Sequence, residues 1–571
     1  MDSFLAPSSL PLVAADTFVA RTDPIGSSVA LSALVALLPL ATFFILLAGV
    51  RTKAWIAAAG SVVVALAVAI LGYHMPVGMA GLAGVMGAVY GLVPIVWIIV
   101  MAIWLYQVTV RSGRFDDLRA VFDVIGGGDL RIQGVLIAFC FGGLLEALAG
   151  FGAPVAITAT MLLALGLPPL KSAVAVLVAN TAPVAFGAVG IPITTAGAII
   201  DPENAADAAA RIGAIVGHQS PILALFVPTL LVFLLDGVRG LKDCWVVTVV
   251  IGVVFGVAQF LSSNYFSYEL TDVVASLVAL AAAVVLLRFY RPKNAEAARE
   301  RLVTPGHAAP EAAKLTGAKV WMALFPYVLV VVVFGVGKLW KLGVNIPAAL
   351  SSTDVKVRFP GLYGHLLTAD GAPSPSAIYT FPWLSNPGTM LFITVVLVTI
   401  VFSIFTANGR YKLTPGGAAT ELGKVLHSTR FACLTIILVL ALAYIMNLSG
   451  QTIAIGTWMA AAGGFFAFLA PVLGWIGTAV TGSDTSANAL FAKLQATAAT
   501  QIGVDPHLFA AANTSGGVVG KLISPQNLAL AATTVGMEGQ ESVILRKVIG
   551  WSVAMLVLLC LIVGIEATLL S

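Results

Sequence analysis

Apolar stretches of about 20 residues, each long enough for a helix to cross a ~30 Å hydrocarbon core, recur from Ser32 to Leu570. Only 10% of the 571 residues are charged and 59% are hydrophobic, whereas soluble domains carry roughly 25% charged residues. A helix satisfies its own backbone hydrogen bonds in lipid, where no water can do so. The sequence therefore predicts an all-α polytopic membrane protein.

A polar element occurs once in each half of the chain, at Ala179–Pro192 and at Ala512–Pro525. Both copies carry an Asn-Thr pair, a Gly and a Pro at the same spacing, namely Asn180, Thr181, Gly187 and Pro192, then Asn513, Thr514, Gly520 and Pro525. The upstream stretches Phe141–Pro154 and Leu473–Ser486 correspond as well. Broken helices at matching places in two halves of a membrane protein indicate a transporter's binding site.

The positions of Lys and Arg predict the path of the chain, because both concentrate on the cytoplasmic side. Arg51 and Lys53 directly follow the first apolar run. We therefore expect an external segment (1–29), a first transmembrane half (30–287), a cytoplasmic linker (288–319) and a second half (320–571) that ends outside. Residues 343–388 are expected outside, as an ordered spacer or as a lid.

Along this path the two matching stretches cross the membrane in opposite directions. The sequence therefore predicts two inverted-topology repeats with broken helices or re-entrant hairpins. Residues 153–167 and 485–500 are short or polar enough to be arms of such hairpins, and they also fit full spans.

The two Asn-Thr elements are the candidate binding site for an anion. We expect the first helix to be interrupted at Asn180–Pro183, and a half-helix N-terminus carries roughly half an elementary positive charge that attracts a carboxylate. Asn and Thr side chains add donors. The candidate substrate-binding residues are Asn180, Thr181, Asn513, Thr514, Ser515 and Lys521. The alternative is a pair of Pro/Gly kinks whose Asn and Thr side chains bond neighbouring helices.

Ionisable side chains inside spans are costly, about 2.5–3.5 kcal/mol each on insertion scales, and indicate function. Glu146, Asp484, Lys493 and Lys521 lie in such places. A carboxyl group shielded from water binds a proton more readily, so Glu146 and Asp484 are the candidate proton carriers, with Asp484 slightly preferred. Lys493 is a candidate charge partner, and an acid–lysine pair that only holds helices together is the alternative.

Several other functions are not supported by the sequence. The formal charge of +4 does not indicate nucleic-acid binding, because the basic residues lie in short loops. The cysteines form no CxxC pair, and no HExxH motif or nucleophile–base set is visible. Gly516–Lys521 is similar to a phosphate loop, but Leu522 replaces the Ser or Thr that would hold Mg²⁺. We expect no cofactor, no metal ion and no membrane-embedded enzyme.

Four strings resemble the L-lactate permease family: EALAGFGAP (Glu146–Pro154), ANTAPVAFG (Ala179–Gly187), GSDTSANALF (Gly482–Phe491) and SPQN (Ser524–Asn527). The resemblance extends over essentially the whole chain and implies a bacterial inner-membrane symporter for lactate and glycolate, driven by protons. The Asn-Thr elements also resemble the Ser-Asn-Thr hairpin tips of sodium-coupled carboxylate transporters. Here Ala179 and Ala512 replace the Ser, which favours the proton over sodium.

Together these observations predict a secondary active transporter that imports L-lactate, glycolate and related small 2-hydroxymonocarboxylates with a proton. Its partners would be the substrate, the proton and the lipid bilayer. The sequence does not determine whether the protein forms a homo-oligomer. The alternatives are a sodium-coupled or exchange-type transporter of mono- or dicarboxylates, a channel, and an enzyme. A dicarboxylate would need more cationic side chains than Lys493 and Lys521 supply.

Overall fold

The structure, a computed structural model, describes residues 17–125, 128–148, 150, 152–304, 316–339, 344–368, 371–407 and 409–570. Parts of the expected N-terminal segment (1–16), of the linker (305–315) and of the external segment (343, 369–370) lie outside the described residues, as does Ser571. Within the described ranges, 11 helical stretches are long and apolar enough to cross a membrane. A twelfth results if Pro169–Val184 and Ala188–Ile200, bent by 40°, form one span. The prediction of an all-α polytopic membrane protein is confirmed.

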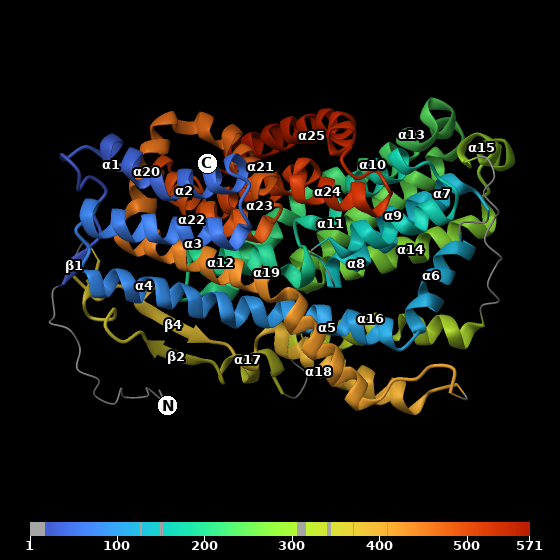
Figure 1. Cartoon of the computed structure of the whole chain (residues 1–571), viewed down its shortest axis with the longest axis horizontal. Coiled ribbons are helices and arrows are strands. Elements are labelled where there is room, and N and C mark those ends of the chain that lie inside the picture. The colour runs from blue at the N-terminus through green and yellow to red at the C-terminus, as the bar shows by residue number, and fades with distance from the viewer. Residues whose placement is uncertain are drawn as a thin grey trace.

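One set of helices comes from the N-terminal part of the chain and from the beginning of its second half. They are α1 (Val29–Ala36), α2 (Leu38–Phe44), α3 (Ala54–Ala67), α4 (Val77–Tyr90), α5 (Trp97–Arg111), α16 (Gly317–Leu339), α18 (Pro387–Ile404), α19 (Pro415–Ser449) and α20 (Gln451–Met459). Helix α19 packs along α3 and α4, and α18 packs along α5 (Figure 1). Glycines allow this close approach, because a β-carbon at Gly87 would collide with the carbonyl oxygen of Leu440.

A second set of helices surrounds the two polar elements. They are α7 (Leu130–Val135), α8 (Gly142–Leu148), α9 (Ala153–Ala164), α10 (Pro169–Ala179), α11 (Thr181–Val184), α12 (Ile191–Ile200), α13 (Ala205–Leu261), α14 (Thr271–Phe289), α21 (Phe466–Thr481), α22 (Asp484–Ile502), α23 (Pro506–Gly520), α24 (Pro525–Thr534) and α25 (Glu541–Leu570). Helix α23 packs against α21, α22 and α13, so segments from both halves of the chain meet here.

The long element α13 is folded back on itself. It is interrupted at Gly237, whose φ of 66° and ψ of −154° are not helical, and a positive φ is readily adopted only by glycine. The two arms then pack closely, since a β-carbon at Gly256 would lie 3.1 Å from the carbonyl oxygen of Pro221. Element α13 therefore supplies two spans joined by a tight turn.

Shorter helical elements extend or connect the helices of the two sets. They are α6 (Arg114–Ile125), α15 (Ala295–Leu302), α17 (Ile346–Ser351), η1 (Ile45–Gly49), η2 (Val68–Gly72), η3 (Gly91–Val96), η4 (Leu136–Phe141), η5 (Ala188–Gly190), η6 (Ser262–Phe266), η7 (Tyr268–Leu270), η8 (Pro375–Ala377), η9 (Ala460–Phe465) and η10 (Lys521–Ile523). Helix α15, in the expected linker, is anchored by ion pairs. Asp236 at the turn of α13 accepts from both Arg301 of α15 and the fully buried Arg131 of α7.

Both expected external segments, 1–29 and 343–388, contain short strands that the sequence analysis did not predict. Strands β2 (Val355–Arg358) and β4 (Ile378–Phe381) pair antiparallel, while β1 (Phe18–Val19) and β3 (Leu366–Leu367) pair in parallel. The Tyr379 hydroxyl donates to the carbonyl of Val93, 2.9 Å away, at the break between α4 and α5. The later segment is thus an ordered unit docked on these helices.

The two halves share one order of elements around the polar motifs. In the first half α8 is followed by α9, by α10 with α11, and by α12; in the second half α21 is followed by α22, α23 and α24. The first turn of each set is made by a glycine with positive φ, Gly150 at 45° and Gly482 at 73°. The opposite orientation of the two sets in the membrane stays a prediction.

Candidate functional site

Both polar elements are broken, and the main break of each lies later than its Asn-Thr pair. In the first element the helix continues as α11 to Val184, and the backbone leaves helical geometry at Gly187 (φ 52°) and Val189 (φ 49°). In the second, α23 ends at Gly520, and Ser524 is extended before α24 begins. The first helix is interrupted within the expected stretch, because α10 ends at Ala179 and α11 begins at Thr181, but Asn180 keeps helical dihedral angles. The bend of 40° follows between Val184 and Ala188.

The prolines of the two elements begin the helices that follow the breaks. Pro192 lies in the first turn of α12, and Pro525 is the first residue of α24. Proline is well suited to this position because its missing N–H would have no partner inside the helix. The repeated Asn-Thr…Gly…Pro spacing thus encodes a helix, a break and a new helix start.

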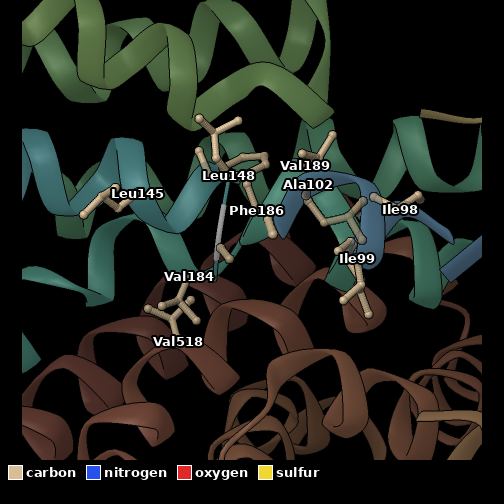
Figure 2. Close-up of a cluster of buried hydrophobic side chains, with 14 of the residues drawn as sticks. Ile98, Ile99, Ala102, Leu145, Leu148, Val184, Phe186, Val189 and Val518 are labelled. Carbon is tan, nitrogen blue, oxygen red and sulfur yellow. The ribbon is translucent and has the colours of Figure 1, made fainter. Parts of the chain in front are cut away.

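Apolar side chains pack around the first break. Figure 2 shows Val184, Phe186 and Val189 from this break together with Leu148 of α8, Val518 of α23 and residues Ile98, Ile99 and Ala102 of α5. A β-branched residue at positive φ, as at Val189, is strained and needs surrounding packing to hold it. This cluster fixes the break relative to both sets of helices.

Two cavities lie between the broken elements. The larger has an empty volume of about 570 Å³ including its open mouth, and its lining comprises Glu146, Gly150, Gly152, Val184, Gly187, Ala188, Ile191, Pro192, Gly482, Ser483, Asp484, Thr485, Lys521, Gln526 and Asn527. The smaller is a narrow crevice with about 180 Å³ of empty space including its open mouth, and it is lined by Leu177, Asn180, Thr181, Val518, Lys521, Leu522 and Asn527. Lys521 and Asn527 border both cavities, so these two residues join them.

The centre of the site is an ion pair between the two halves. Lys521 Nζ lies 2.8 Å from Glu146 Oε1, and the side chains are only 11% and 4% exposed. The Asn180 amide donates to the other carboxylate oxygen, Oε2, at 2.9 Å. Both oxygens of Glu146 therefore accept hydrogen bonds, and one of the two donors is a cation.

Asp484 differs from Glu146 in lacking a cationic partner at hydrogen-bond distance among the described residues. Its Oδ1 accepts a long hydrogen bond of 3.3 Å from Thr478, and its Oδ2 is buried with no partner in the described part of the chain. Gly517 of α23 makes room for it, because a β-carbon there would collide with Oδ1. A buried carboxylate without a counter-ion is costly unless it binds a proton.

Four helix N-termini point to the larger cavity. Its lining includes residues at the starts of α9, α12, α22 and α24. Ser483 and Ser524 cap α22 and α24, whereas α9 and α12 follow Gly152 and Gly190, which provide no side-chain cap. The first N–H groups of α9 and α12 are already bonded, since Ala153 donates to the carbonyl of Gly150 and Ile191 to that of Ala188, and a proline follows in each helix. The partial positive charge of these two helix ends still favours an anion.

The other predicted site residues lie away from these walls. Asn513 and Thr514 donate to Asn488 Oδ1 at 2.7 and 3.0 Å, and Ser515 donates to Gln219 of α13 at 2.6 Å. These three side chains therefore fasten α23 to α22 and α13. Lys493 donates to the carbonyl of Ile200 at 2.7 Å, at the end of α12, and does not pair with Glu146 or Asp484.

Several polar residues of the site were not singled out from the sequence. Ser483, Thr485, Gln526 and Asn527 line the larger cavity. All four lie in two strings that carry the family resemblance, GSDTS and SPQN. This resemblance is the sequence signal from which they could have been identified. Within the described residues, no group of three or more His, Cys, Asp and Glu side chains could hold a metal ion.

Comparison with known proteins agrees with this organisation. The sequence profile described as L-lactate permease matches residues 32–570. The chain is similar to the L-lactate permease of Bacillus subtilis (strain 168), with 39% identity over 95% of this chain and 97% of that protein. It is also similar to the glycolate permease GlcA of Escherichia coli (strain K12), with 40% identity over 90% and 92% of the two chains.

Among solved structures, the YdaH transporter of Alcanivorax borkumensis matches with a TM-score of 0.40 and 13% identity, over 84% of this chain and 86% of that one. This distant likeness does not inform the site. The match to the family profile covers nearly the whole chain, and the sequence relatives match over nine-tenths or more of it. The chain therefore belongs to the L-lactate permease family, whose members are transporters rather than enzymes.

Proposed function

We propose that this protein imports L-lactate, glycolate and related small 2-hydroxymonocarboxylates across the bacterial cytoplasmic membrane by proton symport. The names of its relatives support the substrate class. The observation that carries the proposal is the cavity between the two broken elements, where one lysine and two carboxyl groups from both halves meet. Substrate and proton would bind within one enclosed site.

Lys521 would anchor the substrate carboxylate. It is the cationic side chain in the walls of both cavities, and the uncapped starts of α9 and α12 add partial positive charge nearby. A single cation suits a monocarboxylate better than a dicarboxylate. Thr485, Gln526 and Asn527 line the same cavity, and their hydroxyl and amide groups would bond the 2-hydroxyl group of the substrate.

The charges of the site favour uptake of a proton together with the anion. With Glu146 and Asp484 ionised and Lys521 protonated, the site carries one net negative charge, and a bound monocarboxylate would add another. A proton on Asp484 removes one of these buried charges, whose mutual repulsion is strong in a medium of low dielectric constant. Asp484 would therefore bind the proton, and Glu146 would remain the counter-ion of Lys521.

The proton also makes uptake feasible against the membrane potential. A hydroxy acid of this kind is ionised at neutral pH, so its entry into a negative interior is opposed by about 2.3 kcal/mol per 100 mV. One co-transported proton cancels this electrical cost. The pH gradient can then drive accumulation.

Purified protein in proteoliposomes provides the test. With an acidic exterior, no sodium and no membrane potential, labelled L-lactate should accumulate inside, and a protonophore should abolish the accumulation. An unlabelled dicarboxylate should compete poorly, whereas glycolate should compete well. Accumulation that requires a sodium gradient, or uptake that only equilibrates whatever the pH gradient, would refute proton symport and would support the sodium-coupled or the exchange alternative.

A further inference from the structure

A second buried carboxyl group lies behind the proposed site and has no role so far. Asp272 occupies the first turn of α14 and is 1% exposed. Its Oδ1 accepts a hydrogen bond of 2.8 Å from the Gln259 amide of α13. Its Oδ2 is buried and has no hydrogen-bond partner among the described residues.

Gln259 links this carboxyl group to the broken helix. The same amide nitrogen donates to the carbonyl oxygen of Ala182 at 3.1 Å, and Ser220 donates to that oxygen at 3.2 Å. Ala182 lies in α11, directly before the break, where the helix no longer supplies its carbonyl with a partner. The two side chains thus replace a hydrogen bond that the break removes.

The other side of Asp272 faces the site. Helix α14 packs against α8 (Figure 1). Ser276, one turn beyond Asp272, lies under Gly143 of α8, where a β-carbon would be 2.7 Å from its hydroxyl. That hydroxyl also has no partner in the described part of the chain. Glu146, which pairs with Lys521, is one turn further along α8.

The charged surroundings of Asp272 are acidic or neutral. Glu146 acts on it from α8 as a like charge, Glu269 and Tyr268 lie just before it in η7, and α13 faces it with the uncharged Gln259. Lys521 is bonded to Glu146, and no cation among the described residues bonds Asp272, so an ionised Asp272 would be strongly disfavoured at this depth. A proton on Oδ2 removes the charge and makes Oδ2 a hydrogen-bond donor. The nearby Ser276 hydroxyl is likewise buried without a described partner.

We propose that Asp272 is a second proton-binding group of the transporter, and that Gln259 couples its protonation to the tip of the first broken helix. When Asp272 is neutral, the Gln259 amide holds the Ala182 carbonyl as well as Oδ1. When Oδ2 loses its proton, the bond from Gln259 to Asp272 becomes charge-assisted and shortens. This draws the amide away from Ala182, to which its second N–H donates. Helix α11 and the adjoining Asn180 are then held less firmly, because the bond from Gln259 to Ala182 is weakened. Asp272 is a positioning residue in this account, because it reaches the site through Gln259.

The first test does not depend on transport and therefore separates this inference from the proposed function on which it rests. Infrared spectra of the purified protein in lipid should contain a carboxylic-acid C=O stretching component that disappears in Asp272→Asn and persists in Asp484→Asn. This component should vanish at alkaline pH in the wild-type protein. A spectrum of Asp272→Asn identical to wild type would show that Asp272 is not protonated and would overturn the proposal.

The second test measures exchange of labelled for unlabelled L-lactate at equal pH on both sides, which requires no net proton movement. For one titrating group, wild-type exchange should fall by up to about tenfold per pH unit on the alkaline side. Asp272→Asn keeps an acceptor for Gln259 but cannot ionise. In this variant the decrease of the exchange rate at alkaline pH that is due to Asp272 should be absent. Gln259→Leu should slow exchange at every pH. A wild-type pH profile in Asp272→Asn would mean that Asp272 is structural.

Discussion

Lys521 and Glu146, which lie 375 residues apart in the chain, form a direct ion pair of 2.8 Å between the two halves of the protein. Both side chains line the larger cavity, Glu146 from α8 and Lys521 from η10. The pair therefore has two functions that experiments can separate: it stabilises the contact between halves, and it places the cation that would bind substrate.

The first prediction separates these functions. Lys521→Gln should weaken lactate binding roughly tenfold to over a hundredfold, since a hydrogen bond to a charged group contributes about 1.5–3 kcal/mol. It should also lower stability, because Glu146 is left buried without its partner. The double variant Glu146→Gln/Lys521→Gln should regain stability but not affinity. Lys493→Gln, which removes a lysine outside both cavities, should bind lactate like wild type. Equal losses of affinity at both lysines would contradict the assignment of Lys521.

The second prediction distinguishes the two repeated asparagines. Asn180 lines the smaller cavity and bonds Glu146, whereas Asn513 bonds Asn488 and Gln495 within the helix packing. Asn180→Ala should therefore mainly weaken substrate affinity. Asn513→Ala should mainly lower the melting temperature, because buried partners left without a hydrogen bond cost about 1–3 kcal/mol. Binding isotherms and thermal unfolding of both variants in detergent would decide the matter, and the reverse pattern would refute this division.

The two asparagines also show what the sequence could and could not predict. The spacing of Asn, Thr, Gly and Pro predicted two broken helices in matching places, because glycine and proline act through local backbone geometry. It could not predict that Asn180 borders a cavity while Asn513 faces α22, since this depends on how each helix is rotated in the packed protein. Asp272 was missed for a similar reason: it begins an apolar run, and only tertiary packing buries it. Among the short strands, β2 pairs with β4 of the same segment and β3 pairs with the distant β1, and local patterns reveal neither pairing.

The third prediction concerns the glycine beside Asp484. Gly517→Ala would place a methyl group against Asp484 Oδ1 and within 2.6 Å of the Thr478 hydroxyl, so it should displace the carboxyl group and impair pH-driven uptake. Gly423→Ala, in α19 where nothing lies within 4 Å of the added β-carbon, should transport normally and stabilise its helix by about 0.5–1 kcal/mol. Unimpaired pH-driven uptake by Gly517→Ala would show that the position of Asp484 is not critical.

The fourth prediction tests the path of the chain. A cysteine replacing Glu300, which is exposed in α15, and one replacing Ala372, which is exposed in the segment 343–388, should react with a membrane-impermeant thiol reagent from opposite sides. The partly exposed Cys433 and Cys560 should first be replaced by alanine. Ala298 is unsuitable for labelling because it is fully buried. Labelling of both positions from one side would overturn the path and with it the inverted repeat.

The last prediction concerns the coupling of proton and substrate. Glu146 has hydrogen bonds to both of its oxygens, one of them from Lys521, whereas Asp484 Oδ2 is buried without a described partner. If Asp484 carries the proton, Asp484→Asn should abolish accumulation of lactate driven by a pH gradient, because the site can no longer release a proton inside. The same variant should still exchange labelled for unlabelled lactate at equal pH, since asparagine is neutral like the protonated acid and leaves Lys521 in place.

Glu146→Gln should behave differently. Loss of its charge frees Lys521 from its internal counter-ion, so the affinity for lactate should rise while uptake driven by the pH gradient persists. Uptake with and without the gradient, exchange at equal pH, and the lactate dissociation constant should be measured for both variants. If Asp484→Asn still accumulates lactate and Glu146→Gln does not, the carrier is Glu146, and protonation would then release Lys521 to the substrate. Accumulation by both variants would mean that neither carboxyl group carries the coupled proton.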